Sequence, residues 1–359
     1  MYHKIHWWNF PEDIRILIDD KGYRKSIFRE TSAKIAKKLG VSRTWLVHWR
    51  IGKKGKSCYI PVSKLKKLHE IYKIPKSKTE NFITSYRTSC GKCIDNPILP
   101  ILESPELFQI IGHLYGDGSV TKDKYSSSYC NTSNETRANI RHMIHLVFGK
   151  AELKEYHKSH IIKIPSAISK IVMYHYKIDT FYTFSSKIPE QIIKKEPSLV
   201  KGIIKAFIID EGSIKDSNID IYSANLNLMK DLQNICLKLN YNHSPIKRGS
   251  GCFYFKIYAE SIKKIAKDLI PLPHTKKNEQ LLFIIKKQKR SWNHKNVGRT
   301  KKDILELLSK KSMTAYELGL KLLISSKTIR EHHLKKLEKE GKVIKNGTQR
   351  KLIWSLSKF

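Results

Sequence analysis

The sequence predicts an α+β protein whose core is a duplicated αββαββα unit with pseudo-twofold symmetry, preceded by an all-α domain and followed by a second small domain. Three observations lead to this prediction: one helical motif occurs twice, the segments after each copy also repeat, and short helical patterns occupy both ends of the chain. The 359 residues, 40% of them hydrophobic, can bury the cores of two or three domains. We expect three, at residues 1–95, 96–290 and 291–359, with half-repeats of the core at about 104–190 and 197–285.

An apolar helical run that ends in an acid followed by Gly-Ser is written twice, as IIGHLYGDGSV at 110–120 and as IIKAFIIDEGSI at 203–214. A single copy would suit a buried amphipathic helix that ends at a glycine, with its acid in solvent. Two copies, each followed by further repeated material, favour a duplicated unit instead. The acids that end the two runs are Asp117 and Glu211.

Small residues recur at a spacing of four in both runs. Gly112 and Gly116 have this spacing in the first run, and Gly202 and Ala206 have it in the second. Residues four apart lie on one face of a helix, so each helix carries a stripe on which another helix can pack closely. If the two helices cross there, their C-terminal ends meet and bring the two acids together.

Such a meeting of helix ends predicts a metal site. Two adjacent carboxylates raise each other's proton affinity unless a divalent cation neutralises them. Carboxylates and the unpaired carbonyls of helix ends are the oxygen ligands that Mg²⁺ or Ca²⁺ prefers. The predicted metal-binding residues are the two acids and the residues that precede them: Asp117, Glu211, Gly116 and Asp210.

The segments after the motifs also correspond. Residues 129–144 and 220–235 each read as a short strand, an asparagine and an amphipathic helix, with Asn134 and Asn225 near the helix starts. Further on, 160–172 and 253–266 each read as a β-rich run that turns into a helix. Equivalent lysines lie in these last strands, 46 residues after the first acid and 45 after the second: Lys163 and Lys256.

Both motif copies resemble the LAGLIDADG homing endonucleases, which are named for this helix motif. Gly118 and Gly212 take the last position of the motif, and Asp117 and Glu211 take the position of its metal-binding acid, where the family tolerates Asp or Glu. The resemblance covers residues from about 104 to about 290.

Some positions depart from the motif name. Tyr115 and Ile209 replace its earlier acid, which is not a ligand, and Lys205 lies within the second helix, where family members often have Arg. The resemblance implies that DNA lies in a saddle of two antiparallel sheets and that Mg²⁺ or Mn²⁺ at the acids supports a staggered cut of both strands. It makes Lys163 and Lys256 candidate catalytic residues near the scissile phosphates, although solvated strand lysines would look the same.

The net charge of the chain also indicates a nucleic-acid partner, independently of the motif. Lys and Arg total 69 against 32 Asp and Glu, a formal net charge of +37. Self-repulsion of this size favours a polyanion partner, and nucleic acid is the leading candidate. The sequence contains no apolar run of about 18 residues and no signal-peptide pattern, so we expect no membrane partner and no secretion, but a cytoplasmic, nucleoid-associated protein.

The N-terminal segment contains a pattern typical of a helix-turn-helix. In residues 32–52, Gly40 ends one helix and Ser42 caps the next. This resembles DNA-binding domains of the phage-repressor type, and a small helical bundle without a DNA role is the alternative. The second helix would present four residues to a major groove: Arg43, Thr44, His48 and Arg50.

The C-terminal segment resembles a winged-helix domain. It reads as three helices, the third at about 326–339, and then a hairpin around Asn346-Gly347, a tight-turn signal. A dimerisation or scaffold module is the alternative. Candidate DNA contacts on the third helix are Arg330, His333 and Lys336. The polar, basic segment 286–302 before this domain is predicted to be a linker.

Together these patterns predict a site-specific, Mg²⁺-dependent endonuclease for double-stranded DNA, which acts as a monomer with a pseudo-dimeric core. The alternative on the same scaffold is a non-cleaving transcriptional regulator or a splicing helper that binds intron RNA. Cys90 and Cys93 form a CxxC pair without a second pair at zinc-site spacing, so a loop without metal is favoured.

Overall fold

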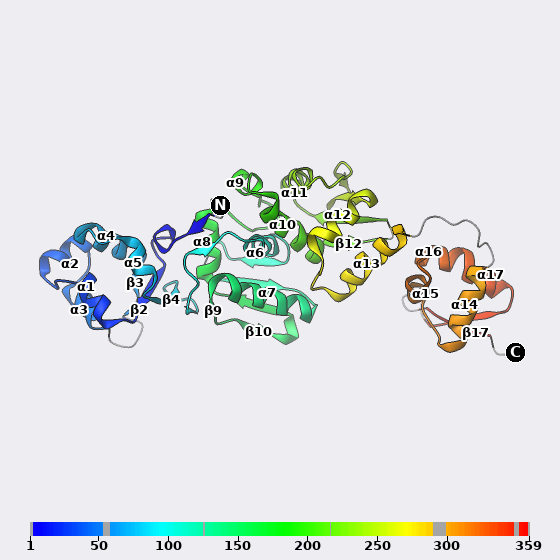
Figure 1. The fold of residues 1–359 in the computed structure, drawn as a ribbon, viewed down its shortest axis with the longest axis horizontal. Helices are drawn as coiled ribbons and strands as arrows, with labels where there is room; N and C mark the ends of the chain where they lie inside the picture. Colours follow the sequence, from blue (N-terminus) through cyan, green and yellow to red (C-terminus); the bar gives the residue numbers. More distant parts are fainter. Residues whose placement is uncertain are drawn as a thin grey trace.

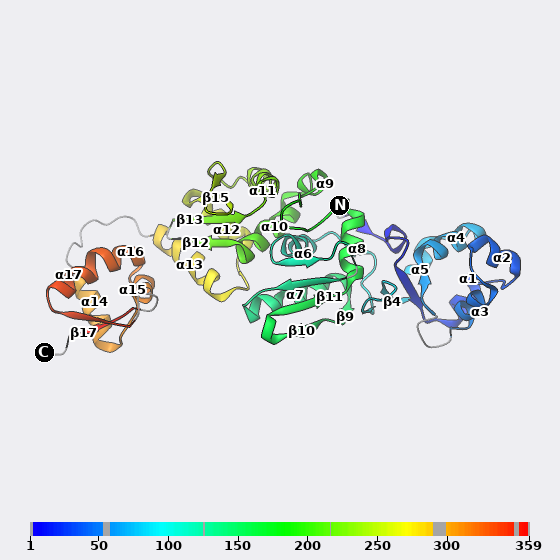
Figure 2. The ribbon, with the colours of Figure 1, turned by 180° about the vertical axis from the view of Figure 1, so that it is seen from behind.

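The computed structural model describes residues 3–52, 58–124, 126–215, 217–289, 299–347 and 352–357. It has a mixed α+β fold in which two four-stranded antiparallel sheets flank a central pair of helices (Figures 1 and 2). One cluster of buried apolar side chains extends from Ile5 to Ile284, through the N-terminal segment and both half-repeats. A second, separate cluster extends from Ile304 to Trp354.

The two motif runs form the central helices α6 (Pro105–Tyr115) and α10 (Pro197–Asp210). The Oγ of Ser104 caps α6 by accepting a hydrogen bond of 3.2 Å from the Leu107 N–H. Each helix has a proline in its first turn, where the missing N–H would have no helical partner.

The small-residue stripes lie where these two helices touch. A Cβ on Gly112 would lie 2.7 Å from the Cβ of Ala206, and a Cβ on Gly202 would lie 2.3 Å from the carbonyl oxygen of Pro105. Neither glycine can therefore gain a side chain without moving a helix. The close crossing that the sequence predicts is confirmed, and it brings together the C-terminal ends of α6 and α10.

The two sheets have the same topology. Each contains, in order across the sheet, the two strands after the motif helix, the last strand of the half-repeat and the strand before it. In the first half these are β7 (Gly118–Val120), β8 (Ser127–Cys130), β11 (Ile161–Ile164) and β10 (Lys154–Tyr156). In the second half they are β12 (Gly212–Ile214), β13 (Asn218–Ser223), β15 (Phe253–Tyr258) and β14 (Lys247–Arg248).

The duplication extends to the strand register. Lys163 lies opposite Ser128 on β8, and Lys256 lies opposite Asp220 on β13. Because the motif glycines also pair at matching positions, the two lysines occupy equivalent places in the two sheets, as the sequence predicts.

In the second half, α11 (Leu226–Lys238) and α12 (Ala259–Leu269) pack against the sheet, and α13 (Thr275–Lys289) contacts β12. Other helices of the core are α7 (Asn134–Phe148), α8 (Ser166–His175) and α9 (Glu190–Ile193). Asn225 caps α11, but Ser133 caps α7, so Ser133 rather than Asn134 is the equivalent of Asn225. The segment expected to be a linker at 286–302 is helical up to Lys289 and again from Arg299, and 290–298 lie outside the described residues.

The expectation of an all-α N-terminal domain is wrong. Its described residues form the helices α1 (Lys21–Ile27), α2 (Ala33–Leu39), α3 (Arg43–Ile51), α4 (Val62–Tyr72) and α5 (Lys76–Glu80). They pack with a five-stranded sheet of β3 (Ile60–Pro61), β2 (Arg15–Ile18), β4 (Ile83–Arg87), β5 (Ile94–Asp95) and β9 (Lys150–Ala151).

Strand pairs connect this N-terminal segment to the core. In the five-stranded sheet, Ile94 pairs with Ala151 of the first half-repeat. A further pair joins β1 (Lys4–Ile5) to β6 (Ile101–Leu102). The segments on either side of residue 95 therefore share a sheet and a hydrophobic cluster.

Short 3-10 helices occur at Trp7–Asn9 and His157–Ser159.

The C-terminal segment has three helical stretches and a strand pair. The first two helices are α14 (Arg299–Lys310) and α15 (Ala315–Leu322). The third is continuous and consists of α16 (Ser326–Thr328), the π-helical stretch Ile329–Leu334 and α17 (Lys335–Lys339). The strands are β16 (Val343–Asn346) and β17 (Ile353–Leu356). Asn346 pairs with Ile353, so the strands are joined by more than the two-residue turn that Asn-Gly suggests.

Candidate functional site

The two motif acids meet at the ends of the central helices. Asp117 follows Gly116, the C-cap residue of α6, and Glu211 is the C-cap residue of α10. Burial and the negative charges of Asp210 and Glu211 raise the pKa of Asp117 to about 7. Burial and the charge of Asp210 likewise raise the pKa of Glu211. The two acids are therefore close enough for their charges to interact, as the sequence predicts, and negative charge is concentrated at the ends of the two helices.

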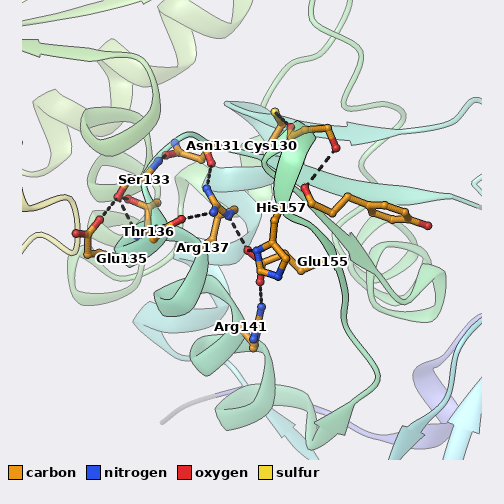
Figure 3. A network of polar contacts seen from close by, with 12 residues as sticks. Cys130, Asn131, Ser133, Glu135, Thr136, Arg137, Arg141, Glu155 and His157 are labelled. Carbon is orange, nitrogen blue, oxygen red and sulfur yellow. Dashed lines mark hydrogen bonds and ion pairs between the residues drawn. The ribbon is translucent and has the colours of Figure 1, made fainter.

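The side-chain amide of Asn131 holds Asp117, and a buried arginine holds Asn131. The Nδ2 of Asn131, just after β8, donates a hydrogen bond of 2.8 Å to Asp117 Oδ2. Asn131 is positioned in turn by Arg137, whose guanidinium donates to the Asn131 carbonyl and, at 2.8 Å, to Glu155 Oε1 (Figure 3). Arg137 is almost fully buried, so this chain of contacts fixes the first acid from behind.

Glu211 has a different environment. Its carboxylate makes no hydrogen bond or ion pair with any other residue in the described ranges. Where the first half has Asn131, the register of β13 places Ser223, whose Oγ instead accepts a hydrogen bond from the Asn225 N–H. The two acids are equivalent in the fold but not in their contacts.

The Asp210 carboxylate faces inward, between the halves. Its Oδ1 accepts a hydrogen bond of 2.6 Å from the Tyr129 hydroxyl, and its Oδ2 lies 2.8 Å from His113 Nδ1. The side chains of His113 and Asp210 are both fully buried. Gln109 Nε2 lies 3.3 Å from the other nitrogen of His113. Because this carboxylate already has two partners, Asp210 could contribute its backbone carbonyl to a cation more readily than its side chain.

Sequence reasoning did not select His113, Tyr129 or Asn131. Polar residues within the two apolar helices were the available signal, since His113 and Asp210 interrupt runs that are otherwise hydrophobic. Their contact joins residues 97 apart in sequence and could not be read without the helix crossing.

Replacing His113 by leucine is expected to lower the free energy of unfolding by about 2 kcal/mol, because the buried carboxylate of Asp210 loses one of its two hydrogen bonds. Chemical denaturation checks this value. In the variant with both H113L and D210N, the loss should be smaller than the sum of the single losses, because the two groups interact directly. Additive losses would show that the contact contributes nothing.

Lys277 on α13 was also missed. Its Nζ donates to the Ile209 carbonyl at 2.5 Å and to the Ile208 carbonyl at 3.1 Å, both in the last turn of α10. Burial lowers the pKa of Lys277, while the charges of Asp210, Asp117 and Glu211 oppose that shift. A lysine therefore lies at the end of the second motif helix, where the charges of these acids act on it.

The strand lysines lie on the outer faces of the sheets. Lys163 is exposed, and its Nζ is 3.4 Å from Ser126 Oγ. Lys256 is half-buried. Ile162 and Phe255, which precede them, point into the core, so alternation directs the lysines outward. In the described residues no hydrogen bond or ion pair joins either lysine to the acids.

The candidate DNA-binding residues outside the core lie on two helices, one in the N-terminal segment and one in the C-terminal segment. Gly40 has a left-handed backbone (φ 62°) between α2 and α3. Arg43 and Thr44 are exposed at the start of α3, whereas His48 and Arg50 are half-buried. On the continuous C-terminal helix, Arg330 and Lys336 are exposed and His333 is half-buried; Arg330 Nε lies 2.9 Å from Glu331.

The oxygen donors at the acids fit a hard divalent cation that is coordinated partly by the protein and partly by a substrate. Within the described ranges, no three His, Cys, Asp or Glu side chains are grouped to enclose a metal ion. The two acids and the carbonyls before them would leave further positions for water or phosphate oxygens. The CxxC cysteines are free thiols, and Cys93 Sγ lies 3.2 Å from the Tyr59 hydroxyl.

Comparison with known proteins gives weak structural likenesses. No protein-family profile and no curated protein matches the chain. Similar solved structures include mesophilic variants of the homing endonuclease I-DmoI (14% identity, TM-score 0.37, covering 47% of this chain and 96% of that chain). They also include I-DmoI in complex with DNA and Mn (14%, 0.35, 47% and 97%) and full-length DUF199/WhiA from Thermatoga maritima (15%, 0.33, 66% and 90%).

All three TM-scores lie below 0.5, so the likenesses carry no argument about activity. Any conclusion about activity therefore has to come from the residues of the site.

In the described part of the chain, no helix is long and apolar enough to cross a membrane.

Proposed function

We propose that this protein is a site-specific endonuclease for double-stranded DNA, in which one chain supplies both halves of the catalytic centre. The observation that carries the proposal is the meeting of Asp117 and Glu211 at the ends of two closely crossed helices. Burial and the charge of Asp210 raise the pKa of both acids, and such acids are costly to keep in a fold unless they serve a cation.

The chemistry follows from this charge. A bound Mg²⁺ or Mn²⁺ would neutralise the charge that develops on a phosphate during hydrolysis. Asp117 and Glu211 would hold it, with the carbonyls of Gly116 and Asp210 as further oxygen donors. The chain's own contribution is position: Asn131 fixes Asp117, and the crossing of the helices fixes the separation of the two acids.

The two sheets suit a duplex. A β-ribbon fits the major groove of DNA, and alternate residues on its outer face can reach bases and phosphates. Lys163 and Lys256 are the equivalent basic residues on those faces, and we assign them to the phosphates nearest the acids. The net charge of +37 supports binding to a polyanion, with an affinity that falls steeply as salt rises.

The flanking helical segments favour a second candidate function. The α2-turn-α3 pair and the C-terminal helices with their strand pair are compatible with additional DNA contacts by Arg43, Thr44, His48 and Arg50 and by Arg330, His333 and Lys336. Such contacts would also serve a regulator that binds DNA without cutting it, or a helper that binds intron RNA. The retained pair of acids favours cutting over both alternatives.

Incubation of the purified protein with a plasmid library of genomic inserts tests the proposal. With Mg²⁺ or Mn²⁺ we expect linear product cut at a defined sequence, and no such product from the D117N, E211Q double variant. The double variant should still bind the same DNA, with the same dependence on salt. Tight binding by the wild type without cutting in any metal would favour the regulator or RNA-helper function instead.

A further inference from the structure

Arg87 is a buried arginine whose charge has no partner among the described residues. It is the last residue of β4 and only 8% exposed. The Cζ of its guanidinium lies 4.2 Å from the centre of the Tyr59 ring, but no hydrogen bond or ion pair joins it to another residue that the structure describes. Arg24 and Arg137, which are also buried, each donate hydrogen bonds. An unpaired buried charge destabilises a fold, so Arg87 points to an anion from outside the chain.

A second arginine lies beside the first on the five-stranded sheet. Arg15 on β2 is directly opposite Arg87 in the register, so both side chains lie on the same face of the sheet. Arg15 is half-buried, and within the described ranges its side chain also forms no hydrogen bond or ion pair. Asp95, opposite Ser85 on this face, makes no ion pair with either arginine. Like charges at opposed positions destabilise a sheet, so this pair too favours a bound anion.

The geometry suits a phosphate at the surface. Guanidinium groups bind phosphate oxygens through parallel N–H donors. Tyr59 limits the orientation of Arg87, since its hydroxyl lies 3.1 Å from Ser85 Oγ and 3.2 Å from Cys93 Sγ while its ring stacks on the guanidinium. Of the three guanidinium nitrogens, only Nε is both enclosed and without a hydrogen bond. The two terminal nitrogens therefore reach the surface, where an anion can contact them.

The face that carries the arginines borders the sheet of the first half-repeat. β9, at one edge of the five-stranded sheet, ends two residues before β10, at one edge of the first-half sheet. Lys154 on β10 lies opposite Lys163, and Tyr156 shares this face of the strand. Lys92, in the loop after β4, is paired with Glu152 and lies near enough to Tyr156 to interact with it electrostatically. The face that we assign to the duplex therefore continues toward Arg87.

We propose that Arg87 and Arg15 bind a backbone phosphate of DNA on the five-stranded sheet, beside the first half of the saddle. The pairing of Ile94 with Ala151 attaches this sheet to the first half-repeat, so the DNA contacts extend on that side. The inference rests on the proposed function for its partner, duplex DNA, but needs neither cleavage nor a metal ion.

Fluorescence anisotropy with a long random-sequence duplex tests the inference, in EDTA and over a series of salt concentrations. R87M removes the charge and keeps a side chain of similar length, and should weaken binding about tenfold. The R15M, R87M double variant removes the whole site. Its slope of log affinity against log salt should be shallower by about 0.9, the value for one phosphate contact. R87K keeps the charge but not the fork of donors, and should lose less affinity than R87M.

Two controls separate binding from folding and from charge in general. Without DNA, R87M should unfold at the same temperature as the wild type or at a higher one, because it removes an unpaired buried charge. K263M removes one charge from an exposed residue of α12, a helix that packs against the second-half sheet. It should leave the salt slope unchanged.

Equal DNA affinity and salt slope in the wild type and the double variant would overturn the inference while leaving the proposed cleavage site standing. Weaker binding that accompanies a lower unfolding temperature in R87M would also overturn it, because the arginine would then serve the fold. If the double variant binds DNA more weakly but the wild type cuts in no metal, this inference stands and the proposed endonuclease falls. If the wild type binds no duplex, both are wrong.

Inorganic phosphate at constant ionic strength distinguishes the source of the anion. If it raises the unfolding temperature of the wild type but not of R87M, while both bind DNA equally, the site holds free phosphate and the assignment to DNA is overturned.

Discussion

Asp117→Asn is expected to make the protein more stable at pH 8, by up to about 4 kcal/mol. Burial and neighbouring acids raise the pKa of Asp117 from 3.8 to about 7, and each unit is worth about 1.4 kcal/mol. Between about pH 4 and pH 7 the folded protein therefore binds more protons at this carboxyl than the unfolded chain does. Stability from this group falls as pH rises through that window and is lowest above it.

Asparagine carries no such proton and can still accept the hydrogen bond from Asn131. The stability of D117N should therefore lack this decline, and the two proteins should converge near pH 4. Thermal unfolding in EDTA at a series of pH values measures the difference. A variant that is less stable than the wild type at pH 8 would show that the carboxylate serves the structure rather than a cation.

Gly202→Ala is expected to destabilise the protein by about 3 kcal/mol, although alanine normally favours a helix over glycine by about 1 kcal/mol. A Cβ at this position would lie 2.3 Å from the Pro105 carbonyl oxygen and 2.8 Å from the Gln109 nitrogen. Both are backbone atoms, so α6 and α10 would have to move apart. The separation would also displace the two acids, so cleavage should fall with stability.

A matched alanine substitution at an open glycine provides the control. At Gly249 a Cβ would meet its nearest atom at 3.5 Å, an ordinary contact, so G249A should change stability by less than about 1 kcal/mol. Urea denaturation of both variants gives the comparison. Equal stability of G202A and the wild type would mean that the helices do not cross as closely as the structure shows.

Much of the core follows from the sequence because its signals are local or repeated. The spacing of Gly112 and Gly202 with their small partners predicts the crossing, and the repeat predicts the matching sheets. The helix expected at 326–339 has these bounds in the structure, although part of it has π-helical geometry.

The N-terminal sheet was missed for a physical reason. Its strands are two to five residues long, too short for an alternating pattern. They also depend on partners far along the chain, as in the pairing of Ile94 with Ala151. Strand propensity reflects such tertiary packing more than local sequence, so the helices around these strands dominated the prediction.

The site itself was predictable only in part. Asp117 and Glu211 are marked by the repeated motif, whereas Lys277 has no motif and reaches the end of α10 only because α13 folds back against it. Asp210 could be chosen from its position before Glu211, but not its inward-facing carboxylate, which depends on His113 and Tyr129 in the other half.

Mapping both cut strands on one cleaved duplex tests most directly whether Asp117 and Glu211 form one paired catalytic site. End-labelled strands would be followed separately for the wild type, D117N and E211Q, each with Mg²⁺ and at equal occupancy of the DNA. We expect two staggered cuts by the wild type, and at least one uncut strand in each single variant, with binding retained. Cutting of both strands at the wild-type rate by either variant would contradict it.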